Sequence, residues 1–263
     1  MSRSWQFTDL EFVVLWEQLD GDPLPFPFTF TSRTPLYDDY LREAREAKDQ
    51  VNRRLNGSFT GVLESVAQPD IRVIVDAWDG LDPKRADGRI RIVASRKGDR
   101  GYLVSQLPGE TYMHSGGFTV TECDPLELAG AVVAALPESE PGEHAEIPLT
   151  PPHEKQDDTD YEYGRSRIGA DSEDAVAVRS RRFLHIPATS VGTIDIIQGS
   201  SVFGPRGISR HRLEWRDLPN SGRYAIGHAP PWKAVSVDRK KLTGMVNTRI
   251  AEVVRVIKEE RTA

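Results

Sequence analysis

Two stretches of the sequence repeat one order of predicted elements, and this repeat restricts the fold more than any other feature. Each stretch begins at a proline, Pro69 or Pro187, and alternates apolar and polar residues with the two-residue period of a strand. The first stretch predicts strands over residues 71–78, 88–96, 102–107 and 118–121. The second predicts strands over residues 189–197, 208–215, 223–228 and 232–237. An aspartate, Asp124 or Asp238, then stands where it would cap a closing helix.

The matching positions of the prolines, turns and caps favour an internal duplication over a chance likeness between two antiparallel meanders. Short turns between neighbouring strands predict antiparallel pairing, and helices at the ends of each stretch predict an α+β architecture. We therefore expect a central, mainly antiparallel sheet built from two similar halves.

Three helices are predicted before the first repeat. Thr8 and Glu11 have the spacing of a capping box, and Phe7 and Phe12 have that of a hydrophobic staple, so the first helix should begin there. Two further helices are expected, from Thr34-Pro35 to residue 55 and over residues 59–66.

Residues 138–174 hold the negative charge of the chain. They contain twelve acidic and three basic side chains, whereas the rest of the chain has 31 basic and 28 acidic residues. Few large apolar residues accompany this charge, so a mostly solvated linker is expected. A cation-binding loop is the alternative, but the register of an EF-hand is absent from the sequence. The expected organisation is an N-terminal half (1–137), this linker (138–174) and a C-terminal half (175–263), within one compact domain.

Charge and hydropathy exclude several classes of protein. With 34 basic and 40 acidic residues the net charge is −6, which argues against a nucleic-acid partner or an anionic membrane surface. No apolar run approaches the roughly 20 residues of a membrane span, and the N-terminal residues lack the apolar core of a signal peptide. The single cysteine, Cys123, allows no internal disulfide and fits a reducing compartment. We expect a cytoplasmic protein without membrane insertion.

Few residues have the spacing of a catalytic, cofactor or metal site. Residues 199–204 resemble a phosphate-binding loop, but Pro205-Arg206 follows instead of the required lysine, so a hairpin turn is expected. None of the six histidines lies four residues from another, the spacing that would place two imidazoles on one helix face. Cys123 precedes a helix cap that could activate its thiol, but a small buried hydrophobe is the preferred interpretation. We expect no catalytic residue, cofactor or metal.

One predicted strand of the second half combines basic and aromatic side chains. Alternation places Arg210 and Arg212 on one face and Leu213 and Trp215 on the other. Basic residues beside aromatic ones can bind single-stranded nucleic acid. The net charge of −6 instead favours a solvated strand face or a protein-binding face.

Four stretches, taken in order, resemble the EspG family of ESX (type VII) secretion-associated proteins of mycobacteria and related actinobacteria. They are FTDLEFVVLWEQL with LPFPF after it, ASRKGDRGYLVSQ, SGRYAIGH and WKAVSVDRKKLTGMVNTRIAEVV. The resemblance implies a central antiparallel sheet in two quasi-symmetric halves, flanked by two helical bundles. It also implies a cytosolic chaperone that binds the PPE-type subunit of a PE–PPE heterodimer, keeps the pair soluble and directs it to secretion. No cofactor or covalent step is implied.

On this resemblance, the partner-binding surface is expected to combine the loop 79–87, the sheet of the second half and the C-terminal helix. Tryptophan and arginine dominate many interfaces, and the candidate residues are Asp79, Leu81, Arg210, Arg212, Trp215 and Trp232. The free protein is expected to be a monomer or a weak homodimer. Two alternatives stay open: an enzyme with a dispersed active site, and a regulatory adaptor that uses the acidic linker to recruit a basic partner.

Overall fold

A computed structural model describes residues 3–20, 23–150 and 167–262, with the backbone alone for residue 20 and residues 167–174. These residues form one ten-stranded sheet, in the order β1-β5-β4-β3-β2-β7-β8-β9-β10-β6, in which every neighbouring pair is antiparallel. The strands are β1 (Ser4–Phe7), β2 (Ile71–Trp78), β3 (Ile90–Lys97), β4 (Arg100–Pro108), β5 (Ser115–Cys123), β6 (Glu146–Pro148), β7 (Ser190–Gln198), β8 (Arg210–Leu218), β9 (Gly222–Gly227) and β10 (Lys233–Ser236). The α-helices are α1 (Asp9–Asp20), α2 (Tyr37–Leu55), α3 (Thr60–Ala67), α4 (Leu128–Ala134), α5 (Arg167–His185) and α6 (Arg239–Thr262).

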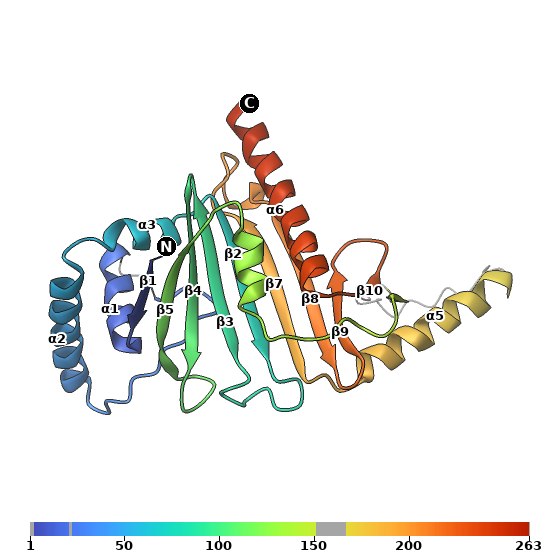
Figure 1. The fold of residues 1–263 in the computed structure, drawn as a ribbon, viewed down its shortest axis with the longest axis horizontal. Helices are drawn as coiled ribbons and strands as arrows, with labels where there is room; N and C mark the ends of the chain where they lie inside the picture. Colours follow the sequence, from blue (N-terminus) through green and yellow to red (C-terminus); the bar gives the residue numbers. More distant parts are fainter. Residues whose placement is uncertain (1–2, 21–22, 151–166, 263) are drawn as a thin grey trace, which may run out of the picture.

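β2 and β7 pair at the centre of the sheet, where the two halves meet. Eight antiparallel residue pairs join them, from Ile71 opposite Gln198 to Trp78 opposite Val191. β3, β4 and β5 extend the sheet on one side, and β8, β9 and β10 extend it on the other in the same chain order (Figure 1). α4 follows β5 as α6 follows β10. The order of elements confirms the predicted repeat and the α+β class.

Helices cover the two faces of the sheet to different extents. α4 and α6 pack together across one face, over a core that includes Val73, Ile194 and Leu242. On the other face, α1 and α3 cover the first half, where Phe12 stacks on Phe118 with ring centroids 4.3 Å apart. α2 packs on the outside of α1. The second half of this face receives only the end of α5 among the described helices.

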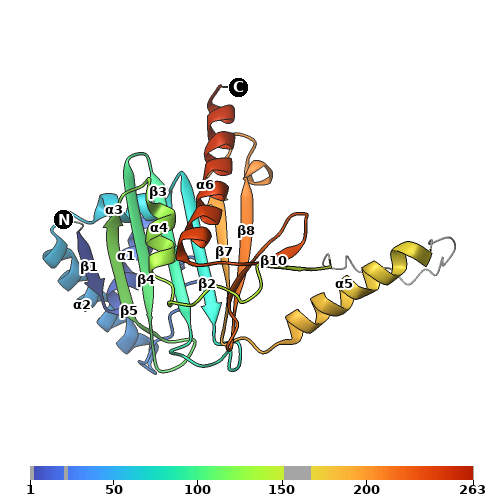
Figure 2. The ribbon, with the colours of Figure 1, turned by 45° about the vertical axis from the view of Figure 1, so that its right-hand side comes forward.

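α5 leaves the body of the molecule where β6, β9 and β10 form the edge of the sheet (Figure 2). Its last turns place Phe183 against Tyr224, with ring centroids 5.4 Å apart, and Leu149 joins this small cluster. The earlier turns extend away from the sheet.

Two of the predicted helix starts are confirmed in detail. The Thr8 amide donates to Glu11 Oε2 at 2.9 Å and the Glu11 amide donates to Thr8 Oγ1 at 3.2 Å, which is a reciprocal capping box. The Lys241 amide donates to Asp238 Oδ1 at 2.7 Å, so Asp238 caps α6 as expected.

Two other predicted starts are wrong by a few residues. The Asp124 side chain accepts from the Leu126 amide at 2.8 Å and closes a turn, so α4 begins only at Leu128. α2 begins at Tyr37 because residues before it form a turn in which Ser32 Oγ accepts from the Thr34 amide at 3.1 Å.

The expectation of a solvated linker over 138–174 is wrong for residues 138–150. β6 pairs with β10, and Pro141 forms a bridge with Arg223. Leu149 is 8% exposed. Local composition does not predict this pairing and burial, because Ile147 and Leu149 bury their side chains against residues far away in the chain. Residues 151–166 of the predicted linker lie outside the described residues, and residues 167–174 belong to α5.

Replacing Leu149 with alanine tests whether this segment belongs to the folded core. Removing a buried leucine side chain should lower the free energy of unfolding by about 2–3 kcal/mol. The exposed residue Glu143, replaced with alanine, provides a control that should change it by less than about 0.5 kcal/mol. Urea unfolding measures the free energy of unfolding of both variants. Equal effects of the two substitutions would indicate that the segment is a solvated linker.

Candidate protein-binding surface

The sheet face opposite α4 and α6 carries no helix over three cross-strand rows of β2, β7 and β8 in the described part of the chain. We call the side chains of these rows the open face. They are Arg72, Ile74, Asp76, Thr193, Asp195, Ile197, Arg210, Arg212 and Glu214. The next row borders the end of α5, where Arg216 donates to the Leu184 and Ile186 carbonyls. Strand alternation determines this set, because the intervening residues of the same strands fill the core under α4 and α6.

The open face is organised in cross-strand rows. In the first row, Ile197 lies between Arg72 on β2 and Arg210 on β8. In the second row, Asp195 lies between Ile74 and Arg212. Arg212 donates from Nε at 2.6 Å and from Nη2 at 2.9 Å to the two carboxylate oxygens of Asp195, so this row is electrically balanced.

The third row contains two carboxylates, and each has a basic group beside it. Thr193 lies between Asp76 and Glu214. Arg89 Nη1 lies 3.9 Å from Asp76 Oδ1, and Arg91 lies opposite Asp76 on β3. Burial raises the pKa of Asp76 above its ordinary value, although Arg89 and Arg91 oppose this shift. Glu214 Oε1 lies 2.7 Å from Nε2 of His228, so neither carboxylate of this row is isolated.

A groove of about 690 Å³ runs over the first two rows. Ile74, Ile197 and Ile208 supply apolar lining, and Pro25 and Phe26 line it from the segment that follows α1. The Phe26 side chain is 61% exposed. The groove is wide and open, which suits a protein segment better than an enclosed small molecule.

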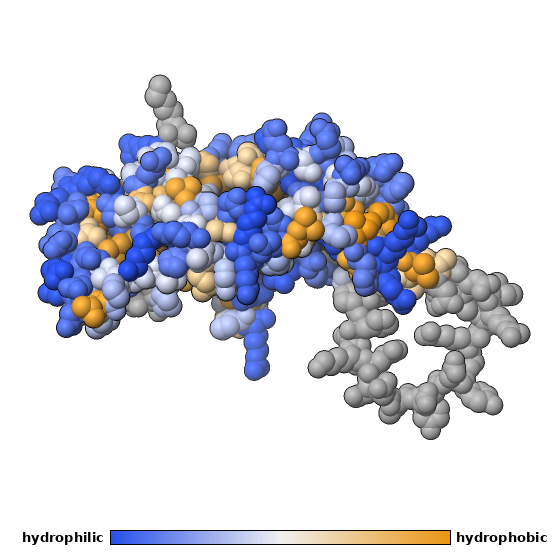
Figure 3. All heavy atoms as spheres, turned by 90° about the horizontal axis from the view of Figure 1, so that it is seen from below, coloured by the Kyte–Doolittle hydropathy of each residue, from blue (hydrophilic) through white to orange (hydrophobic). Residues whose placement is uncertain are grey.

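The segment that carries Phe26 is attached to the sheet by polar contacts. Gln106 of β4 accepts from the Thr29 amide and donates to the Thr29 carbonyl, both at 2.9 Å. Seen from below, apolar side chains also appear at the surface toward the end of the molecule where α5 leaves the body (Figure 3). Val178 and Leu184 of α5 are 61% and 45% exposed.

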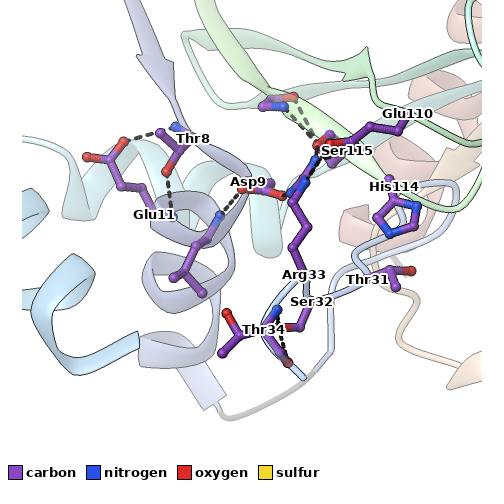
Figure 4. Close-up of polar contacts among 12 residues, drawn as sticks. Thr8, Asp9, Glu11, Thr31, Ser32, Arg33, Thr34, Glu110, His114 and Ser115 are labelled. Atoms are coloured by element: carbon purple, nitrogen blue, oxygen red, sulfur yellow. Dashed lines mark hydrogen bonds and ion pairs between the residues drawn. The ribbon is translucent and has the colours of Figure 1, made fainter. Parts of the chain in front are cut away.

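Arg33 makes the second attachment of this segment (Figure 4). Its guanidinium donates to Glu110 from Nε at 2.7 Å and from Nη2 at 2.8 Å, and it also contacts Asp9 and the Ser115 carbonyl. The bonds from Arg33 lower the pKa of Glu110 to about 2, so the carboxylate stays charged at neutral pH. Arg33 thereby links α1, the segment after it and the β4–β5 loop.

The structure brings most of the predicted partner-binding residues to the borders of the open face. Arg210 and Arg212 lie on it, and Trp232 is half-buried with its ring 6.3 Å from the ring of His228. In the β2–β3 loop, Leu81 is 65% exposed. Asp79 organises this loop, because its carboxylate accepts from the Leu81 amide at 2.8 Å and pairs with Arg85 at 2.9 Å.

The expectation that Trp215 is a surface anchor is wrong. Its side chain is 1% exposed and belongs to the core under α4 and α6. Its ring lies on Gly192 of β7, where a Cβ atom would come within 2.3 Å of the indole. Strand alternation predicts Trp215 on the face opposite Arg212, and the structure confirms that alternation. Phe26, by contrast, was missed, since no local pattern indicates which aromatic of a proline-spaced segment stays exposed.

The described residues contain no group of three or more histidine, cysteine or acidic side chains that could hold a metal ion. Burial, with Asp124 and Glu122 nearby, raises the pKa of the Cys123 thiol to about 11, which agrees with its preferred interpretation as a small buried hydrophobe. Residues 199–204 connect β7 and β8 as the expected turn, with a 3-10 turn over Pro205–Gly207. Among the described helices, none combines the length and the apolar character that a membrane span requires.

Comparison with protein families matches residues 8–247 to the EspG family. The chain belongs to the EspG family. Among solved structures, the chain is similar to EspG5, the type VII secretion system chaperone of Mycobacterium tuberculosis, determined in complex with a PE25-PPE41 dimer. The TM-score is 0.48 at 12% sequence identity, covering 95% of this chain and 96% of that chain. Comparison with curated proteins gives no match. The EspG membership confirms the resemblance that the four sequence stretches carried.

Cys123 should resist alkylation in this EspG protein. With a pKa of about 11, about one thiol in a thousand is ionised at pH 8, and the thiolate is the reactive form. Iodoacetamide treatment followed by mass spectrometry should leave the folded protein unmodified, while the protein in urea reacts fully. Rapid modification of the folded protein would instead indicate an activated thiol.

Proposed function

We propose that this EspG protein is a cytoplasmic specificity chaperone of a type VII secretion system. It binds the PPE-type subunit of a PE–PPE-type heterodimer, keeps the pair soluble and directs it to the secretion machinery. Membership of the EspG family supports this proposal. The observation that carries the placement of the partner is the open face, a broad sheet surface that the described helices leave uncovered.

The side chains of the open face suit a protein partner. Ile197 on the open face and the exposed ring of Phe26 at its border provide apolar contact area, and Arg210 and Arg212 provide polar contacts beside them. Protein interfaces commonly combine an apolar centre with a polar rim, and arginines are frequent among their strongest contacts. A chaperone of this kind needs no reacting group.

The exposed apolar residues of α5 extend this surface. Soluble proteins rarely expose large contiguous apolar patches without a partner that covers them. Val178 and Leu184 lie on α5, whose last turns contact the border of the open face while its earlier turns extend away from the sheet, so an elongated partner would be needed to contact both. The partner-binding region then comprises the open face, the loop 79–87 with Leu81, Trp232 and α5. The C-terminal helix α6, which was expected to belong to it, packs on the opposite face of the sheet.

An enzyme with a dispersed active site is less well supported. A catalytic pair of carboxylates would need differently shifted pKa values within one cleft. On the open face, Asp195 is occupied by Arg212, and Asp76, whose pKa is raised, does not line the groove. The described residues therefore favour binding over catalysis.

Co-expression with PE–PPE-type pairs from the same genome tests the function. A stoichiometric ternary complex should elute as one species in size exclusion. Replacing Arg212 with alanine should weaken the complex by about tenfold, since central interface arginines contribute about 1–2 kcal/mol. Arg255, exposed on α6 on the opposite face, provides the matched control, and its replacement with alanine should leave the affinity unchanged. Failure to form a complex with every folded pair would refute the proposed function. A complex that is weakened by the Arg255 substitution alone would refute the placement of the partner on the open face.

Replacement of residues 151–166 with an uncharged Gly/Ser segment of the same length separates the chaperone from the adaptor. Residues 151–166 carry acidic side chains, and an equal length keeps Thr150 in contact with Ser180 of α5 and preserves β6. The chaperone should keep its substrate pair after the replacement, with an affinity within about twofold of the intact chain, as expected for a change outside the contact surface. An adaptor that recruits a basic partner through this segment should lose that partner.

A further inference from the structure

Two arginines in the first row of the open face have no carboxylate partner among the described residues. Arg72 and Arg210 flank Ile197 on neighbouring strands. Because adjacent strands are about 4.8 Å apart, the two backbones lie about 10 Å from each other, with Ile197 between them. Arg212, in the next row, differs because Asp195 neutralises it. The positive charge over Ile197 is therefore local and uncompensated.

Arg72 is held in place by the end of α3. Its Nη2 donates to the Ala67 carbonyl at 2.7 Å and to the Val66 carbonyl at 3.5 Å, while Nε is buried without a partner. These bonds fix the guanidinium without cancelling its charge. Burial also lowers the pKa of Arg72 below its ordinary value.

The same end of the groove has an apolar wall. Pro25 and Phe26 line it on one side, and Ile197 and Ile208 contribute apolar lining from the sheet and from the turn before β8. Phe26 is exposed although Gln106 and Arg33 attach its segment firmly, so its ring is presented to solvent by an ordered part of the chain. An apolar side chain placed against Phe26 would lie beside the two cationic groups.

We propose that this end of the groove binds a partner segment in which an apolar side chain lies next to a carboxylate, with the carboxylate over Ile197 between Arg72 and Arg210. This inference rests on the proposed function and specifies what its binding face recognises. The chain as a whole has a net charge of −6, so the local charge does not reflect a generally basic protein.

The other two rows decide which anion fits. Asp195 pairs with Arg212 in the second row, and Arg89 and His228 lie beside Asp76 and Glu214 of the third row. Neither row therefore offers a further uncompensated cation. A single carboxylate matches the two arginines of the first row, whereas a polyanion such as a nucleic-acid backbone would need a series of cationic sites along the groove.

Small probes with one apolar group and different polar groups test this without the natural partner. The intact protein is titrated with phenylpropionate, phenylpropanol or phenylpropylamine, and NMR follows the backbone amides of Arg72, Ile197 and Arg210. Phenylpropionate should bind about twofold to fivefold more tightly than phenylpropanol, as partly exposed ion pairs allow. The amine should bind most weakly, and 0.5 M salt should reduce the differences through a Debye length of about 4 Å.

Arg210→Gln should remove the preference for the carboxylate. Arg206→Gln, an exposed arginine on the neighbouring 3-10 turn, should keep it, and the folded state of each variant is read from the same spectra. Equal binding of the three probes, shifts outside the first row, or an unchanged preference in Arg210→Gln would overturn the inference. The co-purification with substrate pairs reports on the chaperone function separately, so a negative titration beside a stable ternary complex overturns this inference alone.

Discussion

The pairing of β2 with β7 is the interaction on which the rest of the structure depends. Eight residue pairs join the two halves of the chain into one sheet and place α4 beside α6 on the same face. Strand alternation then directs every second side chain of β2 and β7 into the core under α4 and α6, including Val73 and Ile194. The residues between them, such as Arg72 and Ile197, therefore point to the other face of the sheet.

The two halves differ in what covers that other face, and this difference creates the candidate site. In the first half, α1 and α3 and the aromatic cluster around Phe12 cover β3, β4 and β5. The second half contributes the end of α5, which contacts the edge around Phe183. The uncovered strands in between carry paired and unpaired charges beside apolar groups. A duplicated sheet with unequal helical cover thus leaves the proposed binding face free of helices among the described residues.

Much of this arrangement follows from local patterns in the sequence. Period-2 alternation located the strands of both repeats, and Asp238 and the Thr8–Glu11 pair marked helix starts through bonds within one turn. Contacts between distant residues could not be predicted in the same way. Leu149 is buried by Phe183 and its neighbours, and Phe26 lies exposed beside the groove. Trp215 shows a further limit, since residue type suggested an anchor while strand alternation placed it in the core.

Hydroxyl-radical footprinting of the protein, alone and in complex with a PE–PPE-type pair, tests whether the proposed partner covers the open face. Phe26 and Tyr37 are both exposed aromatic residues, at 61% and 71%, but only Phe26 borders the open face. We expect the complex to protect Phe26 and Trp232 from oxidation and to leave Tyr37 as reactive as in the free protein. Protection of Tyr37 or of α6 with no change at Phe26 would contradict this placement.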